Sequence, residues 1–293
     1  MNLRNFNRPT LVVIAGPTAV GKTQFAINVA KACESVVISA DSRQFYKEMP
    51  IGTAAPTAEE LAQVPHYFVG HLSIHDYYSV SRFEQDVLAL LPQLFEKHTA
   101  VVMSGGSGMY IDAVCHGIDD LPDPEAEVRD YVHALFRDEG VAGLRTQLRR
   151  LDPAYYDRCN LADHKRMMRA IEVSLQTGRP YSEHLLNARK TRDFDIVKVL
   201  LTRPRAELFD RINRRTALMM EQGWLDEARA LYPFRHLNSL NTVGYKELFE
   251  YLDGHMTLEQ AITDIQTHTR HYAKRQMTWF RRPGSGYQML PLS

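Results

Sequence analysis

A stretch of eight residues near the start of the chain carries groups suited to binding phosphate, and it reads G-P-T-A-V-G-K-T. The spacing G-x-x-x-x-G-K-[ST] is typical of a phosphate loop, because the glycines let successive backbone N–H groups turn toward one anion. Lys22 adds a positive charge, and the hydroxyl of Thr23 can serve as a ligand of Mg²⁺. The alternative is a glycine turn with a surface lysine. The expected phosphate-binding residues are Gly16, Pro17, Thr18, Ala19, Val20, Gly21, Lys22 and Thr23.

A carboxylate, Asp41, follows the apolar run 35–40, and Ser42, Arg43 and Gln44 come directly after it. Ligands of an open parallel sheet bind beyond the carboxyl ends of its strands. We therefore expect Asp41 on the same rim as the phosphate loop. The alternative is an aspartate that caps a helix or stabilises a turn.

Two arginines later in the chain, Arg211 and Arg215, are four residues apart and share one face of a predicted helix. Two guanidinium groups on one face suit a diphosphate, since each can donate a fork of hydrogen bonds. The alternative is that they pair with Glu207, Asp210 or Glu221.

A basic segment precedes them, with seven Lys or Arg against two acids between positions 165 and 192. Helical spacing places Lys165, Arg166 and Arg169 on one face. Such a face is either solvated or contacts the phosphate backbone of a nucleic acid.

The elements that position these groups alternate between short apolar strands and amphipathic helices. A long helix near the end carries Tyr272 and Gln276 on its apolar side. The expected strands are 11–15, 35–40, 99–103 and 196–201, and the expected helices include 80–97, 128–151, 162–175 and 257–282. We therefore predict an α/β fold of the P-loop NTPase type, a parallel sheet flanked by helices with an all-helical insertion domain. The third strand is not followed by the magnesium-binding aspartate of kinases and motor ATPases, which argues against nucleotide hydrolysis.

The domain boundary is expected where composition changes. Between Asp119 and Asp130 there are six acids and one base, and no strand pattern returns before Ile196. We predict a catalytic core formed by 1–122 and 191–293, and a helical insertion at 123–190.

Composition restricts the class of protein. The chain has 293 residues, and its 35 Lys and Arg balance 35 Asp and Glu, which does not exclude a nucleic-acid partner if charge is segregated along the chain. Three distant cysteines fit a reducing compartment, and no apolar run is long enough to cross a membrane. We predict a soluble cytoplasmic protein, and we expect a monomer.

A set of motifs occurs in one order along nearly the whole chain, from Leu11 to about Arg282. They are G-P-T-A-V-G-K-T from Gly16, I-S-A-D-S-R-Q-F-Y from Ile38, I-G-T-A-A-P-T from Ile51, G-G-S-G-M-Y from Gly105, K-R-M-M-R-A-I-E from Lys165, T-G-R-P from Thr177, L-F-D-R-I-N-R-R from Leu208, V-G-Y-K-E from Val243 and A-K-R-Q-M-T-W-F from Ala273. In this order the sequence resembles the bacterial tRNA dimethylallyltransferases, or tRNA isopentenyltransferases, of the IPP transferase family.

The resemblance implies a reaction. A dimethylallyl group would pass from dimethylallyl diphosphate to the N6 amine of adenosine 37, next to the tRNA anticodon, and diphosphate would leave with the help of Mg²⁺. Asp41 would take the proton of the amine, and Thr18 would reach between the diphosphate and the reacting centre. Lys22, Arg211 and Arg215 would neutralise the leaving group.

The resemblance also implies how tRNA binds. The base would swing out into a channel open at both ends, and the insertion would hold the anticodon stem-loop. The implied tRNA contacts are Asp41, Ser42, Arg43, Gln44, Ser107, Arg129, Lys165, Arg166, Met167, Met168 and Arg169.

The sequence departs from the family pattern at two places. Ser107 stands where many members have threonine, and Ala162 precedes Asp163 where they have Asn-Asp. No Cys/His set follows Arg282, so we expect no zinc. The rival hypotheses are an enzyme that prenylates free adenine nucleotides, a P-loop kinase or ATPase, and an RNA-binding module without catalysis.

Overall fold

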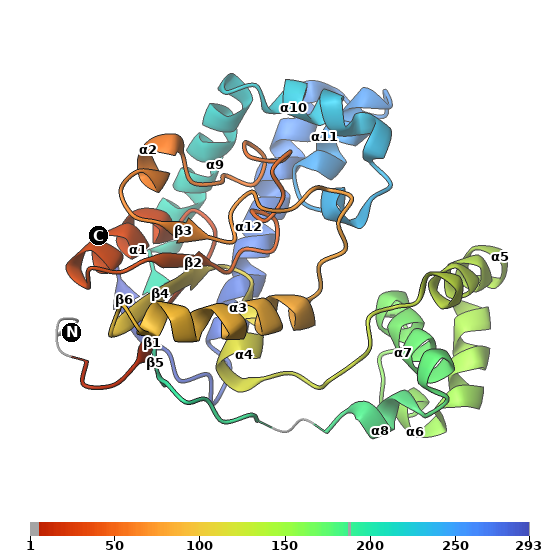
Figure 1. Ribbon diagram of the computed structural model, residues 1–293. Coiled ribbons are helices and arrows are strands. Elements are labelled where there is room, and N and C mark those ends of the chain that lie inside the picture. Colours follow the sequence, from red (N-terminus) through yellow and green to blue (C-terminus); the bar gives the residue numbers. More distant parts are fainter. Residues whose placement is uncertain (1–5, 187–188, 293) are drawn as a thin grey trace. The chain divides into compact units, whose positions relative to one another are not determined.

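The chain divides into two compact units in the computed structural model, which describes residues 6–186 and 189–292. Unit 1 comprises Met1–Cys115 and Arg192–Ser293, and unit 2 comprises His116–Thr191 (Figure 1). The insertion predicted at 123–190 lies wholly within unit 2.

A parallel sheet forms the centre of unit 1. The described residues form six strands in the order β3-β2-β4-β1-β5-β6, all paired in parallel. The strands are β1 Thr10–Ala15, β2 Val37–Ser39, β3 His66–Tyr67, β4 Ala100–Gly105, β5 Asp195–Thr202 and β6 Gln288–Pro291. Each parallel connection runs through helices, so the predicted α/β class is confirmed.

Helices cover both faces of this sheet (Figure 1). Alternate residues of β1 point to opposite faces. On one face Leu11 and Val13 pack with α3 and α4, and on the other Val12 and Ile14 pack with α1 and α9. The helices of unit 1 are α1 Lys22–Ala32, α2 Ala58–Leu61, α3 Val80–Phe95, α4 Gly108–His116, α9 Arg205–Glu221, α10 Trp224–Leu231, α11 Tyr245–Leu252 and α12 Leu258–Phe280, with short 3-10 helices at Tyr232–Phe234 and Asn238–Leu240.

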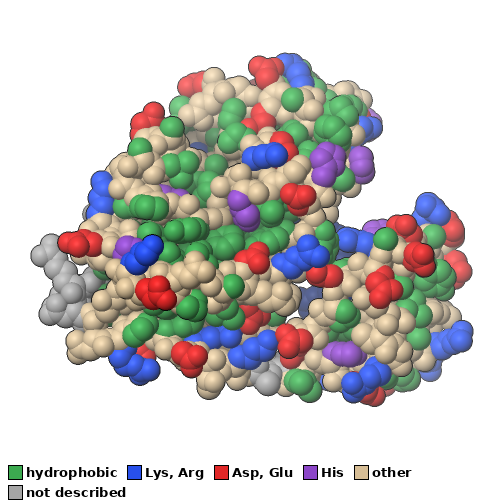
Figure 2. Space-filling model, in the orientation of Figure 1, with side chains coloured by type: hydrophobic (Ala, Val, Ile, Leu, Met, Phe, Trp, Pro, Cys, Tyr) green, Lys and Arg blue, Asp and Glu red, His purple; other side chains and the backbone are tan. Residues whose placement is uncertain are grey.

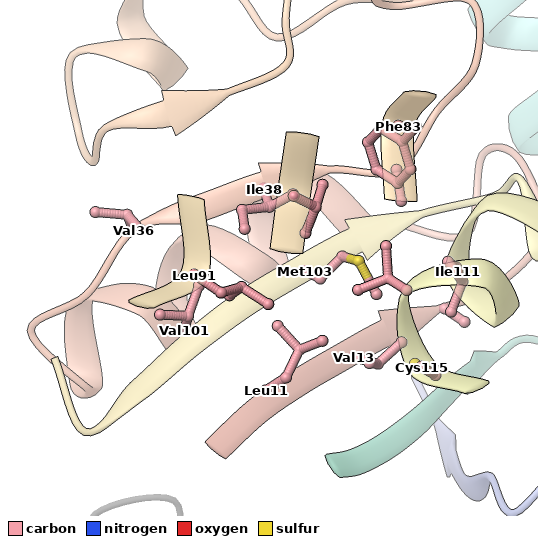
Figure 3. Packing of buried hydrophobic residues seen from close by; sticks show 14 of the residues in the cluster. Leu11, Val13, Val36, Ile38, Phe83, Leu91, Val101, Met103, Ile111 and Cys115 are labelled. Carbon is pink, nitrogen blue, oxygen red and sulfur yellow. The ribbon is translucent and has the colours of Figure 1, made fainter. Parts of the chain in front are cut away.

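The first of these cores is apolar and buried. Figure 3 shows Leu11 and Val13 of β1 beside Met103 of β4, with Phe83 and Leu91 of α3 packed above them. All five side chains are at most 1% exposed. A sheet buried on both faces needs uninterrupted apolar strands, which is why the strand pattern was readable in the sequence.

Unit 2 is helical throughout its described residues. Its helices are α5 Ala126–Leu151, α6 Pro153–Tyr156, α7 His164–Thr177 and α8 Tyr181–His184. Buried Asp152 joins them, because its carboxylate accepts hydrogen bonds from the backbone N–H groups of Tyr155 and Ser182 and from the Ser182 hydroxyl. The helix predicted at 128–151 is bent at Gly140, whose φ is 63°.

Two short strands, β3 and β6, lie at the edges of the sheet. β3 and β6 were not among the expected strands; β3 has only two residues, and β6 is short and exposed along its whole length. Basic and acidic side chains are interspersed on the face of unit 1 drawn in Figure 2. Among the described helices, none is long and apolar enough to cross a membrane.

Candidate active site

The phosphate loop joins β1 to α1, as the sequence predicts. Its turn uses two left-handed residues, Ala19 with φ 64° and Gly21 with φ 107°. Two arginines fix its backbone, because Arg211 Nε donates to the Ala19 carbonyl at 2.8 Å and Arg203 Nε donates to the Val20 carbonyl at 2.9 Å. The loop is therefore shaped by α9 and the end of β5 as well as by its own glycines.

Cations gather beside this loop in an open cavity of about 670 Å³. Lys22, Arg211 and Arg215 all line it, together with Thr23. Two of the three acids considered as alternative partners pair elsewhere, since Glu207 pairs with Arg203 and Asp210 with Arg214. Three cations facing one cavity favour a polyanionic ligand such as a diphosphate.

Lys22 has an altered proton affinity in this setting. Burial lowers its pKa to about 8, the Asp41 carboxylate opposes that change, and the Arg215 guanidinium adds to it. Burial also lowers the pKa of Arg215. A bound anion would relieve both effects, because it stabilises the charged form of each group.

A second, smaller cavity of about 100 Å³ meets the first one at Asp41. Residues that line both cavities include Thr18, Asp41 and Arg215. Arg215 donates a hydrogen bond of 2.5 Å to the Thr18 hydroxyl. The carboxylate of Asp41, the hydroxyl of Thr18 and a cation thus stand where two hollows of unit 1 join.

The residues after Asp41 fix the walls of this junction. The Arg43 N–H donates to Asp41 Oδ1 at 3.1 Å, and the Arg43 guanidinium donates to the carbonyls of Asn238 and Ser239, both at 2.9 Å. Ser107 accepts a hydrogen bond from the Ser42 N–H at 3.0 Å. Ser42, Arg43 and Ser107 are therefore brought beside Asp41.

Gln44 holds the loop that lines both cavities. Its side-chain amide donates to the carbonyls of Thr53 at 3.3 Å and Ala54 at 3.0 Å. These contacts are internal, so they explain Gln44 as a wall residue.

Comparison with known proteins identifies the family of the chain. The model of the IPP transferase family matches residues 44–283. The chain belongs to the IPP transferase family. The tRNA dimethylallyltransferase 2 of Parabacteroides distasonis is 53% identical over 273 residues, which are 93% of this chain and 91% of that relative. The prediction of a prenyltransferase that modifies tRNA is confirmed.

Solved structures of family proteins share the fold. The full-length tRNA isopentenylpyrophosphate transferase of Bacillus halodurans is 36% identical and matches with a TM-score of 0.69, covering 97% of this chain and 90% of that one. A eukaryotic dimethylallyltransferase acting on tRNA is 26% identical and matches with a TM-score of 0.80, covering 96% of this chain and 73% of that one. The predicted P-loop NTPase-like architecture is confirmed.

Two residues of α12 contribute to the site of this IPP transferase in ways that sequence spacing did not indicate. Buried Gln276 accepts a hydrogen bond from the Thr18 N–H at 2.8 Å and donates to the Gly106 carbonyl at 3.0 Å. Tyr272 lines the smaller cavity, and burial raises its pKa to about 12. The only signal was a polar group on the apolar side of a helix.

The basic helix α7 divides into exposed and buried positions. Lys165 and Arg166 are exposed. Met167 is fully buried and Met168 is 7% exposed in the core of unit 2, which corrects their prediction as RNA contacts. Arg169 turns inward, donating to the Pro122 carbonyl at 2.5 Å and pairing with Glu172.

Arg129, the other tRNA contact predicted in unit 2, lies in the first turns of α5. It is partly buried and already takes part in an internal interaction.

The donor set for magnesium is sparse. Among the described residues, no three His, Cys, Asp or Glu side chains are grouped to hold a metal ion. Thr23 lines the larger cavity beside the cations, and Mg²⁺ commonly takes one or two protein ligands plus phosphate oxygens and water. The residues present therefore fit a magnesium ion that arrives with a diphosphate.

Proposed function

We propose that this chain transfers the dimethylallyl group of dimethylallyl diphosphate to N6 of adenosine 37 in tRNA, with diphosphate as the second product. The observation that carries the proposal is the meeting of the two cavities at Asp41, Thr18 and Arg215. The larger cavity has a cationic wall suited to a diphosphate. The smaller cavity, of about 100 Å³, meets it at Asp41 and would receive the acceptor amine.

The proposed reaction is a substitution at the prenyl carbon. The bond between N6 and the prenyl carbon forms as the bond from that carbon to the ester oxygen of the diphosphate breaks. One N6 proton moves to the Asp41 carboxylate. An exocyclic adenine amine is a weak nucleophile, so a carboxylate that removes its proton during attack lowers the barrier. Asp41 is proposed as that base.

The leaving group is stabilised from the other side. Thr18 accepts a hydrogen bond from Arg215, so its own hydroxyl hydrogen is available to the ester oxygen that joins the prenyl carbon to the diphosphate. Lys22, Arg211 and Arg215 would hold the phosphate oxygens, where negative charge grows as the bond breaks. Thr23 would hold a magnesium ion, which when bound withdraws negative charge from the diphosphate.

The tRNA is proposed to contact both units. In unit 2, Lys165 and Arg166 offer exposed cations. In unit 1, an open hollow on α12 of about 590 Å³ has a mixed cationic and aromatic lining of His271, Lys274, Arg275, Thr278, Trp279 and Arg282. Cations beside an exposed tryptophan suit phosphate contacts and base stacking on RNA.

We also propose that the protein acts as a monomer in the cytoplasm. Every residue that lines the two cavities comes from unit 1 of one chain, so a second copy is not needed to complete the site.

An acceptor comparison tests the proposal. The protein is mixed with labelled dimethylallyl diphosphate, magnesium and either AMP or unmodified tRNA. We expect label in tRNA alone. Label in AMP alone would identify an enzyme of free nucleotides, and ATP turnover without use of the prenyl donor would identify a kinase or ATPase.

A further inference from the structure

Glu227 of α10 has a carboxylate that accepts three hydrogen bonds from groups outside its own helix. It accepts hydrogen bonds from the Ile51 N–H at 2.9 Å, from the Gly52 N–H at 2.8 Å and from the Tyr245 hydroxyl at 2.5 Å. Burial and the Glu227 charge raise the pKa of Tyr245, which keeps that hydroxyl as the donor. Hydrogen bonds to a carboxylate are among the stronger ones in proteins.

The loops beside this carboxylate pack too closely for a side chain at either of two glycines. A Cβ on Gly52 would lie 2.3 Å from Trp224 Nε1 and 2.4 Å from the Tyr245 hydroxyl. A Cβ on Gly244, whose φ is 99°, would lie 2.1 Å from Trp224 Cζ2. Trp224 is thus inserted between the two glycines, and α10 fits closely against both of their loops.

Both loops are walls of the site. Gly52 and Thr242 line the smaller cavity, while Thr53 and Ala54 line both cavities. Gln44 holds this wall segment by its carbonyls, and Glu227 holds it by its N–H groups. The wall where the two substrates would meet is therefore held from two sides. Gln44 lies close to Asp41 in sequence, and Glu227 lies far from it.

We propose that Glu227 is a positioning residue that keeps the wall at Ile51–Ala54 closed against water during prenyl transfer. This inference rests on the proposed function. If the wall loosens, water can replace the amine: a water oxygen bonds to the prenyl carbon as its bond to diphosphate breaks, and one proton is released. The products are then dimethylallyl alcohol and diphosphate.

The test measures how labelled donor divides between prenylated tRNA and dimethylallyl alcohol in one reaction. Glu227→Gln keeps the shape but replaces one acceptor oxygen with a donor, so it cannot accept from Ile51, Gly52 and Tyr245 together. We expect alcohol per transfer to rise by about tenfold or more. A lower amount of folded protein would reduce both products equally and leave this ratio unchanged.

Asp226→Asn is the matched control, since it removes the same charge from the neighbouring residue of α10. Asp226 is 79% exposed and pairs with Arg229 at 2.7 Å. We expect the ratio of the native protein for this variant. Glu227→Asp, which keeps the charge on a shorter side chain, should give an intermediate ratio and serves if Glu227→Gln does not fold.

A second measurement does not depend on activity. Amide hydrogen exchange in the segment 49–55 should accelerate about tenfold in Glu227→Gln, while β1 stays as protected as before. An unchanged product ratio, or unchanged exchange in 49–55, would overturn the inference. If the native protein does not prenylate tRNA at all, the proposed function fails, and the exchange experiment still decides whether Glu227 fixes this wall.

Discussion

Single residues at the junction of the two cavities carry the proposed chemistry. Asp41 stands there with Thr18 and Arg215, and its Oδ1 accepts a hydrogen bond from the Arg43 N–H. The bond to Arg43 positions the carboxylate, while the open cavity leaves it accessible to a substrate.

Asp41→Asn isolates the role of this carboxylate as a base. The asparagine oxygen can still accept the hydrogen bond from Arg43, but the amide cannot take a proton. We expect prenyl transfer to fall by about 10²–10⁴-fold while tRNA affinity stays the same. Single-turnover transfer and a tRNA binding titration measure the two effects, and an unchanged rate would remove Asp41 from this role.

The depressed pKa of Lys22 predicts a pH dependence of donor binding. Burial lowers the pKa of Lys22 from its ordinary value of 10.5 to about 8 in the protein without ligand. A diphosphate favours the charged form, so binding should take up a proton and affinity should fall as pH rises through 8. Calorimetry in buffers of different ionisation enthalpy detects this uptake. Lys22→Met should abolish it, and uptake that persists in this variant would exclude Lys22 as its source.

Among the elements, α7 has two sides with different surroundings. Its apolar side forms the core of unit 2 through Met167 and Met168, and Lys165 and Arg166 remain on the exposed side. A helix that packs on one side presents only its other side to a partner. The basic run therefore offers fewer solvent-facing cations than its sequence suggests, because Arg169 pairs with Glu172.

Removing the two exposed cations tests the RNA-binding role of α7. The double variant Lys165→Ala with Arg166→Ala should bind tRNA more weakly, and the slope of log affinity against log salt should decrease by about 1–2. Donor affinity should not change. Arg214→Ala with Arg229→Ala removes two exposed cations from unit 1 as the control. Equal loss of tRNA affinity in both double variants would show that α7 has no special part.

At the scale of the whole molecule, the proposed chemistry lies in unit 1 alone, whereas the proposed tRNA contacts lie in both units. Unit 1 contains the complete lining of both cavities, and unit 2 has its own core. The chain enters and leaves unit 2 at neighbouring points, since the Lys190 N–H donates to the His116 carbonyl at 2.8 Å. Unit 2 is therefore removable without cutting the sheet.

Replacing residues 118–188 by a short flexible linker tests this separation. We expect the shortened chain to bind dimethylallyl diphosphate as the full chain does, because every cavity residue remains. Its affinity for tRNA should fall by at least about tenfold. Calorimetry and gel-shift titrations measure the two affinities. Retained tRNA binding would place recognition on unit 1 alone.

The sequence by itself determined the features that depend on neighbouring residues. The phosphate loop has its glycines, lysine and threonine within one turn, and the short apolar runs at 11–15 and 99–103 are typical of the buried strands that the structure has there. The end of a parallel strand faces the ligand edge, so Asp41 was predictable as a site residue from local spacing.

Only the tertiary structure decided which distant groups support these residues. Gln276 contacts Thr18 across 258 positions of sequence, and Glu227 contacts Gly52 across 175. No local pattern marks such partners, because a polar side chain in a helix has the same spacing whether it faces water or a buried loop. Packing also decided which side of α7 faces the core of unit 2. Burying methionine is favourable because it removes apolar surface from water, whereas burying an unpaired lysine charge costs free energy.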